Sequence, residues 1–124
     1  MSEVGGLTDG SLTPGIYRVL DPVGVITAAT AAAGWSVAVI APAERTRDLY
    51  ANLAGGLELP DWFGRNLDAL WDVLTDRNQP TLVIMVDWTR YARARPERWS
   101  MIMDVFRERC SLPPPFAVVL ANAA

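Results

Sequence analysis

Three aspartates recur at four-residue spacing near the middle of the chain: Asp68, Asp72 and Asp76. On a helix this spacing places the three carboxylates along one side. Such carboxylates could contact cationic groups of a partner or, within a cleft, act as an acid and base pair. Neighbours four residues apart repel by about 0.2 to 0.5 kcal/mol per pair, and only Asp68 lies where the helix dipole favours an acid. Helix stability alone therefore does not explain the pattern, although a solvated helix face would show it too.

The residues around the aspartates predict the elements that must position them. An apolar stripe runs beside them at helical spacing: Leu67, Leu70, Trp71 and Leu74. Asn66 is a suitable N-cap for this helix. Just before it, Trp62 stands in a loop between Pro60 and Gly64, and aromatic side chains in loops are enriched at binding hot spots. The segment therefore predicts an exposed aromatic loop that leads into an amphipathic helix with one acidic face.

The composition restricts both the partner and the chemistry. The chain has 124 residues, a net charge of −3 and no histidine, and its pI is about 4.8. Polyphosphates repel such a molecule, so we expect a basic partner and no nucleic acid. Without histidine the commonest general base and metal ligand are missing, and we expect no metal and no cofactor. The single cysteine, Cys110, the absence of a basic leader and the short apolar runs favour a cytoplasmic protein that binds no membrane.

The pattern along the chain predicts an α/β fold with a small, mainly parallel sheet of three or four strands packed against helices. Four segments have the composition of strands: residues 16–20, 35–40, 81–86 and 116–120. Three segments besides the acidic helix have helical features: residues 22–33, 47–54 and 98–108. We expect Gly55 and Gly56 to end the second of these helices, and residues 87–97 to form a polar connection. Residues 1–12 are expected to be a flexible tail and residues 13–124 a single domain.

The string from Gly64 to Asp72, Gly-Arg-Asn-Leu-Asp-Ala-Leu-Trp-Asp, resembles the binding segment of the barstar family, which are protein inhibitors of microbial ribonucleases. The similarity extends more loosely from about Arg47 to Leu120 and includes residues 104–108 on a later helix. About the first 35 residues have no recognised counterpart. The resemblance implies a barstar-like fold, to which the first strand and helix are an extension.

The resemblance also implies a function and a surface. The protein would be an intracellular inhibitor of a secreted, guanyl-type microbial ribonuclease, or the immunity protein of a bacterial RNase-type toxin, in a 1:1 complex. Asp68 and Asp72 would enter the basic active site in place of substrate phosphate, and Glu108 would be a third acidic contact. The implied partner-binding residues are Trp62, Gly64, Asn66, Leu67, Asp68, Trp71, Asp72, Thr75, Asp76 and Glu108.

The chain departs from the family pattern around this surface. Trp62 stands where the family usually has tyrosine, so a hydrogen bond from that hydroxyl is lost. Asp76 and Arg77 stand where barstar itself has glycine and tryptophan, and Gln79 replaces an acid. These differences bear on which ribonuclease is bound.

Several residues and the function itself have alternative interpretations. Trp71 and Phe63 could each belong to the core or to the contact surface, and Asn66 could cap the helix, contact the partner or do both. Glu108 lies between two arginines and could be a solvated acid. An enzyme that uses Asp68 with Asp72, as in glycoside hydrolysis, would need one carboxyl of raised pKa in a cleft. An adaptor or immunity protein for a basic partner other than a ribonuclease would carry the same acidic surface.

Overall fold

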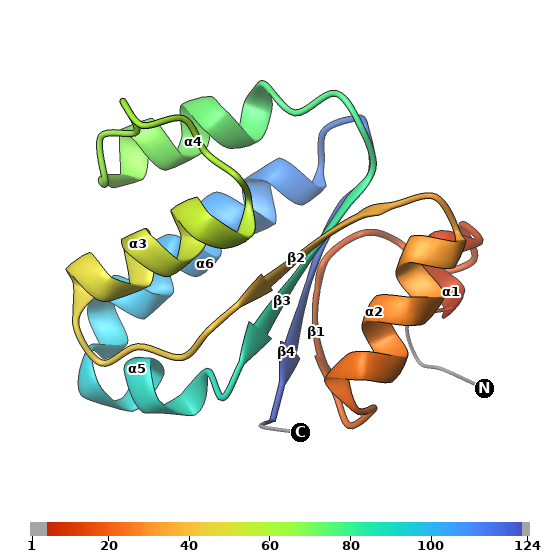
Figure 1. The fold of residues 1–124 in the computed structure, drawn as a ribbon, viewed down its shortest axis with the longest axis horizontal. Helices are drawn as coiled ribbons and strands as arrows, with labels where there is room; N and C mark the ends of the chain where they lie inside the picture. Colours follow the sequence, from red (N-terminus) through yellow and green to blue (C-terminus); the bar gives the residue numbers. More distant parts are fainter. Residues whose placement is uncertain (1–4, 123–124) are drawn as a thin grey trace.

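Four parallel strands form one sheet in the computed structural model, which describes residues 5–122 of the chain. The strands are β1 (Ile16–Val19), β2 (Ser36–Ile40), β3 (Thr81–Val86) and β4 (Phe116–Ala121), in the spatial order β1-β4-β3-β2. The helices are α1 (Gly5–Thr8), α2 (Val23–Ala32), α3 (Thr46–Gly56), α4 (Leu67–Thr75), α5 (Thr89–Ala94) and α6 (Pro96–Cys110). Helices cover both faces of the sheet (Figure 1). The α/β class and the parallel sheet are confirmed.

The two central strands are apolar at every position except Thr81, because both of their faces are buried. On β3, Val83 and Met85 point into a core shared with α3, α4 and α6, which we call the main core. Leu82 and Ile84 alternate with them and point into a second core, shared with α1 and α2. Because successive side chains of a strand point to opposite faces of the sheet, this one strand contributes residues to both cores.

The first strand and helix lie at the far edge of the sheet and on its second face. β1 pairs with β4 whereas β2 pairs with β3, so the connection through α2 crosses the whole sheet between its two edges. Residues 1–4 of the expected N-terminal tail lie outside the described residues. Residues Gly5–Thr8 form α1, and Leu7, which is 3% exposed, packs into the second core. The flexibility of residues 1–12 stays a prediction.

Two of the expected boundaries are wrong. The stretch 87–97 is largely helical, because α5 carries Tyr91 into the main core, where its hydroxyl group lies 2.7 Å from that of Thr46. The α3 helix includes Gly55 and ends at Gly56, with Leu57 as its C-cap. Glu58 then reverses the chain with a positive φ of 55°. The two glycines are therefore helical residues, and only one of them is required by packing.

We expect Gly56→Ala to lower the free energy of unfolding by about 1 to 3 kcal/mol, the usual cost of overpacking a core. An added Cβ would lie 2.5 Å from Ile40 Cδ1 and 2.9 Å from the Val39 carbonyl oxygen, so a backbone atom of β2 would have to move. Gly55→Ala is the matched control, because its Cβ meets nothing within 4 Å. It should raise stability by about 0.5 to 1 kcal/mol. Urea unfolding of both variants tests this, and equal effects would contradict the close approach of α3 to β2.

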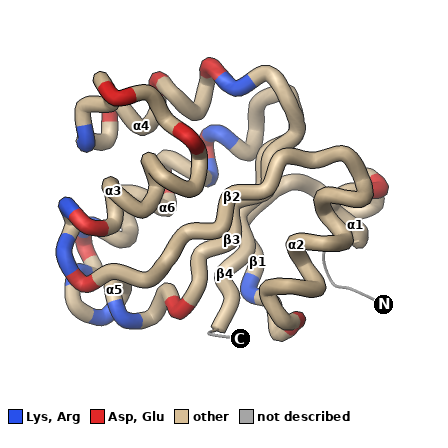
Figure 2. Tube along the Cα trace, in the orientation of Figure 1, with Lys and Arg blue, Asp and Glu red and all other residues tan. Residues whose placement is uncertain are grey.

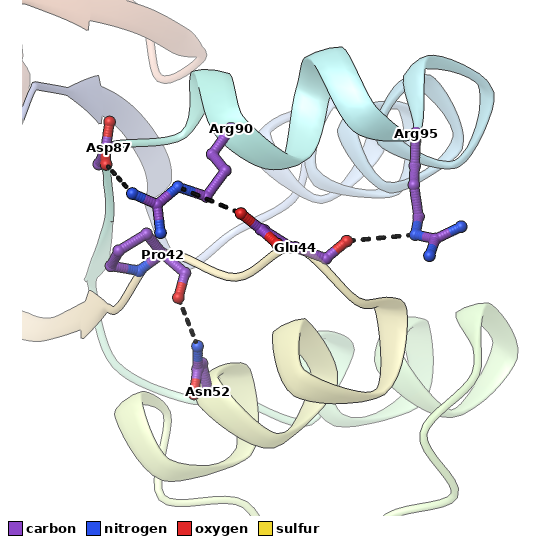
Figure 3. Close-up of polar contacts among 6 residues, drawn as sticks. All are labelled: Pro42, Glu44, Asn52, Asp87, Arg90 and Arg95. Atoms are coloured by element: carbon purple, nitrogen blue, oxygen red, sulfur yellow. Dashed lines mark hydrogen bonds and ion pairs between the residues drawn. The ribbon is translucent and has the colours of Figure 1, made fainter.

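The loop between β2 and α3 is fastened to the segment around α5 at the carboxyl edge of the sheet (Figure 3). The side chain of Arg90 lies 3.9 Å from the Glu44 carboxylate and 3.7 Å from that of Asp87. Arg95 Nε donates to the Glu44 carbonyl at 3.2 Å, and Asn52 donates to the Pro42 carbonyl at 3.3 Å. These contacts fix the start of α3 relative to the start of α6.

Candidate functional site

The α4 helix is anchored by a polar cap and by apolar side chains below it. Asn66 Oδ1 accepts from the Ala69 N–H at 2.8 Å, which confirms the predicted N-cap. Leu70 and Leu74 are fully buried in the main core, and Val73, which the sequence analysis did not single out, is buried with them. The buried side of α4 is therefore centred on Leu70, and the opposite side of the helix faces solvent.

Asp68 and Asp72 lie on that solvent-facing side, and both are exposed. Asp76 follows as the C-cap, and its backbone N–H bonds to the Asp72 carbonyl at 3.2 Å. Within the described residues, none of these three carboxylates has an ion-pair partner within 4.0 Å. In Figure 2, acidic positions follow one another along α4 and the loop before it. Three carboxylates are thus presented to solvent without a cation of their own.

An exposed tryptophan and a half-buried tryptophan flank the carboxylates. Trp62 is 73% exposed, so the expected aromatic loop is observed, whereas Phe63 beside it is buried with its ring centroid 6.2 Å from that of Tyr50. Phe63 is therefore a core residue. Trp71 is half-buried and lies at the edge of the apolar stripe, not at its centre. Helical geometry places Trp71 and Ala69 on opposite flanks of the acidic face.

The loop before α4 is shaped by Arg65 and Asn66 as much as by Gly64. The residue with a positive φ is Arg65, at 50°, whereas Gly64 has no left-handed conformation. Gly64 is needed for space, since an added Cβ would lie 3.3 Å from Ala69 Cβ and 3.3 Å from Asn66 Nδ2. Asn66 Nδ2 also donates to the Gly64 carbonyl at 3.0 Å. Asn66 thus closes the loop with its amide nitrogen and caps the helix with its amide oxygen.

Thr75 makes hydrogen bonds within the last turn of α4, and Arg77 follows the helix two residues later. Thr75 Oγ1 lies 3.0 Å from the carbonyl oxygens of Trp71 and Asp72 and donates within the last turn. Arg77, expected only to alter specificity, joins three elements. Its guanidinium donates to Thr81 Oγ1 at 3.0 Å, the Leu57 carbonyl at 3.1 Å and Ser36 Oγ at 3.2 Å. This role could not be predicted from the sequence, because Leu57 and Ser36 lie 20 and 41 residues from Arg77.

An open depression of about 370 Å³ lies next to Trp62, between the loop before α4 and the turn after it. Val73 and Asp76 of the α4 region, together with Glu58 and Arg77, contribute to its walls. Burial lowers the pKa of Arg77, and the nearby Glu58 opposes that shift. The Arg77 guanidinium is half-buried and already donates hydrogen bonds within the protein. The exposed charged groups at this depression are therefore the carboxylates of Glu58 and Asp76.

Glu108 lies on α6, the helix that packs beside α4 in the main core, and it is exposed. Its carboxylate has no ion-pair partner among the described residues, whereas Asp104 one turn earlier is 2.8 Å from Arg107. The next residue, Arg109, donates from Nε to the Leu74 carbonyl at 2.7 Å. This bond ties the end of α4 to the end of α6 and sets where Glu108 lies relative to the acidic helix.

The remaining candidate groups do not form a reactive centre. Burial raises the pKa of the Cys110 thiol to about 11, against the opposing effect of Arg109, so the thiol is protonated at neutral pH. A protonated, buried thiol is a poor nucleophile. Residues 5–122 contain no cluster of three metal-ligating side chains. Within the same range, no helix is long and apolar enough to cross a membrane.

An exposed acidic helix face and an exposed loop tryptophan thus lie on an α/β domain built on one four-stranded parallel sheet. The model of the family described as Barstar (barnase inhibitor) matches residues 38–121, and the chain belongs to this family. The match starts in β2 and ends with β4, so β1 and α2 precede it.

One curated relative is the "Putative ribonuclease inhibitor YrdF" of Bacillus subtilis (strain 168), which is 53% identical over 32 residues. The match covers 26% of this chain and 35% of the relative, so it spans about a third of that protein's length.

Proposed function

We propose that this protein inhibits a ribonuclease by covering its active site with the exposed face of α4 and the adjoining Trp62 loop. Membership of the barstar family and the similarity to a protein named as a ribonuclease inhibitor support the ribonuclease as the class of partner. One observation supports the choice of this surface: Asp68, Asp72 and Asp76 are all exposed, and none of them forms an ion pair with an arginine of the described residues.

The physical argument starts from what a ribonuclease must bind. A site that holds a phosphodiester needs cationic donors, and carboxylates can form charge-assisted hydrogen bonds with the same donors. In the free inhibitor these carboxylates are solvated, so no internal salt bridge has to break before binding. The buried Leu70 and Leu74 keep the helix backbone in place, which lowers the ordering cost of association. Asp72, in the middle of the acidic face, would enter the basic pocket most deeply.

The proposal extends to the kind of target. The target is a basic, guanyl-type ribonuclease that a microorganism secretes, or an RNase-type toxin, bound in a 1:1 complex. A cell that makes such an enzyme needs to block the fraction that stays in its cytoplasm. The net charge of −3 favours rapid encounter with a basic protein through long-range attraction.

We expect stoichiometric inhibition when the protein is titrated into a panel of basic, guanyl-type microbial ribonucleases. Cleavage of a fluorogenic RNA should fall linearly with added protein and reach its minimum at one equivalent, and the purified protein alone should cleave neither RNA nor glycosides. A double variant, Asp68→Ala with Asp72→Ala, is the control for a specific effect. If no ribonuclease of the panel is inhibited, an adaptor for another basic partner becomes the better account.

A further inference from the structure

A cleft of about 450 Å³ opens at the first turn of α4, at the other end of the helix from Asp76. It lies between the starts of α3 and α4 and the first turn of α6. Its lining residues are Thr46, Tyr50, Arg65, Asn66, Leu67, Asp68 and Arg98. A smaller pocket adjoins it and shares Thr46, Tyr50, Leu67 and Arg98 with the cleft, while Met101 and Ile102 complete its lining. Polar and charged side chains thus line the cleft together with the apolar Leu67.

Two arginines that line this cleft have no acid of their own. Arg65 and Arg98 are exposed, and neither has a carboxylate within 4.0 Å in the described part of the chain. This contrasts with Arg90 and Arg107, which have acidic partners at 3.7 Å and 2.8 Å. In Figure 2, a basic position lies in the loop immediately before α4, next to the acidic positions of that loop and helix. The acidic face of α4 thus has a cationic border at its N-terminal end.

A mostly buried tyrosine contributes a hydroxyl group to the same cleft. Tyr50 is only 5% exposed, yet its hydroxyl makes no hydrogen bond within residues 5–122 and it lines both the cleft and the smaller pocket. Burial raises the pKa of Tyr50, Tyr91 adds to the rise, and Arg98 opposes it. The hydroxyl is therefore protonated at neutral pH and free to donate. Tyr50 and Arg98 line the same cleft.

The fold holds this arrangement in place before any partner binds. Arg95 Nε donates to the Glu44 carbonyl at 3.2 Å, which ties the residue before α6 to the loop before α3 (Figure 3). At the same point, the Thr46 and Tyr91 hydroxyl groups are 2.7 Å apart. The elements that carry Tyr50 and Arg98 are thus fastened to each other at the edge of the cleft.

We propose that the bound ribonuclease places one carboxylate side chain, an aspartate or a glutamate, in this cleft between Arg65 and Arg98. The inference rests on the proposed function. A carboxylate suits a cleft with two guanidiniums and one phenol, because it carries a single charge and accepts paired N–H donors. An RNA strand fits less well, since the acidic face of α4 would repel its neighbouring phosphates, whereas a single side-chain carboxylate brings no further charges of its own. The target then needs an acid beside its basic pocket, which would exclude ribonucleases without one.

The test measures dissociation constants for the ribonuclease that the unmodified protein inhibits most strongly in the panel. We expect Arg65→Gln and Arg98→Gln each to weaken binding about 3- to 10-fold, and Tyr50→Phe to weaken it by less. Arg93→Gln is the matched control, because Arg93 is exposed on α5 and does not line the cleft. Each aspartate and glutamate on the ribonuclease surface is then changed to its amide. One of these variants should abolish the effect of Arg98→Gln, as a double-mutant cycle requires for a direct contact.

The other possible results each contradict a different part of the proposal. If Asp72→Ala weakens binding but the Arg65→Gln, Arg98→Gln double variant binds like the parent, the cleft is empty in the complex and the proposed function stands. If the arginine variants weaken binding but no acid of the ribonuclease couples to them, the effect is long-range and the contact is disproved. Binding of a labelled RNA oligonucleotide by the free protein, lost on Arg98→Gln, would assign the cleft to phosphate instead. If no ribonuclease binds, both proposals fall together.

Discussion

Asp72→Ala is expected to weaken ribonuclease binding more than any other single substitution, by about 30-fold to several thousand-fold. That range corresponds to about 2 to 5 kcal/mol, the usual cost of truncating one partner of a buried interfacial charge pair, a scale measured partly on the barnase and barstar complex of this family. Asp72 projects from the centre of the exposed face of α4, so its removal would leave several cations of the partner unpaired. Isothermal titration calorimetry or stopped-flow dissociation measures the loss.

The stability of the free protein should hardly change in the same variant. Asp72 is exposed, makes no ion pair among the described residues and lies four residues from both Asp68 and Asp76, so its removal relieves repulsion. Asp68→Ala should have the second largest effect on binding. Asp9→Ala is the charge-matched control, because Asp9 follows α1 on the opposite face of the sheet. Parent-like binding of Asp72→Ala would show that another surface meets the ribonuclease.

The fold was predictable from the sequence wherever one physical signal dominated. Residues 81–86 are Thr81 followed by five consecutive apolar residues, and they form β3 within the predicted bounds. The α5 helix was missed because residues 87–97 contain three arginines and a proline, which resemble a solvated connection. Its single buried anchor, Tyr91, meets partners on α3 and α6 that are distant in sequence. Local composition cannot report such a contact.

The site shows the same division between local and distant signals. The acidic face and the Asn66 cap follow from spacing within one helix, and both could be predicted. The role of Arg77 could not, because its hydrogen bonds reach back 20 residues to Leu57 and 41 residues to Ser36. The cleft beside Asp68 is built from the starts of three helices that only the folded topology brings together. The acidic face of α4 could therefore be predicted from the sequence, whereas the residues that surround it in space could not.

The buried guanidinium of Arg109 is expected to make a large contribution to the stability of the fold. Arg109 is 1% exposed and has no acidic partner in the described residues. It donates instead to three carbonyl oxygens: those of Leu74 at 2.7 Å, Leu112 at 2.7 Å and Pro114 at 3.2 Å. Its charge lies 5.1 Å from the centroid of the Phe116 ring and next to the C-terminal end of α4, where the helix dipole favours a cation. One side chain thus joins α4, α6 and the turn before β4.

We expect Arg109→Met to lower the free energy of unfolding by about 2 to 4 kcal/mol. Methionine fills similar space but leaves the Leu112 and Pro114 carbonyls without a donor and the Leu74 carbonyl with only a backbone N–H at 3.4 Å, at about 1 to 3 kcal/mol for each unsatisfied buried group. Part of this cost is offset because the guanidinium, whose Nη2 has no hydrogen-bond partner, is no longer buried. Arg107→Met is the matched control on the same helix. Its exposed ion pair with Asp104 should contribute less than about 1 kcal/mol. Urea unfolding compares the two, and equal losses would show that the carbonyl contacts of Arg109 do not stabilise the fold.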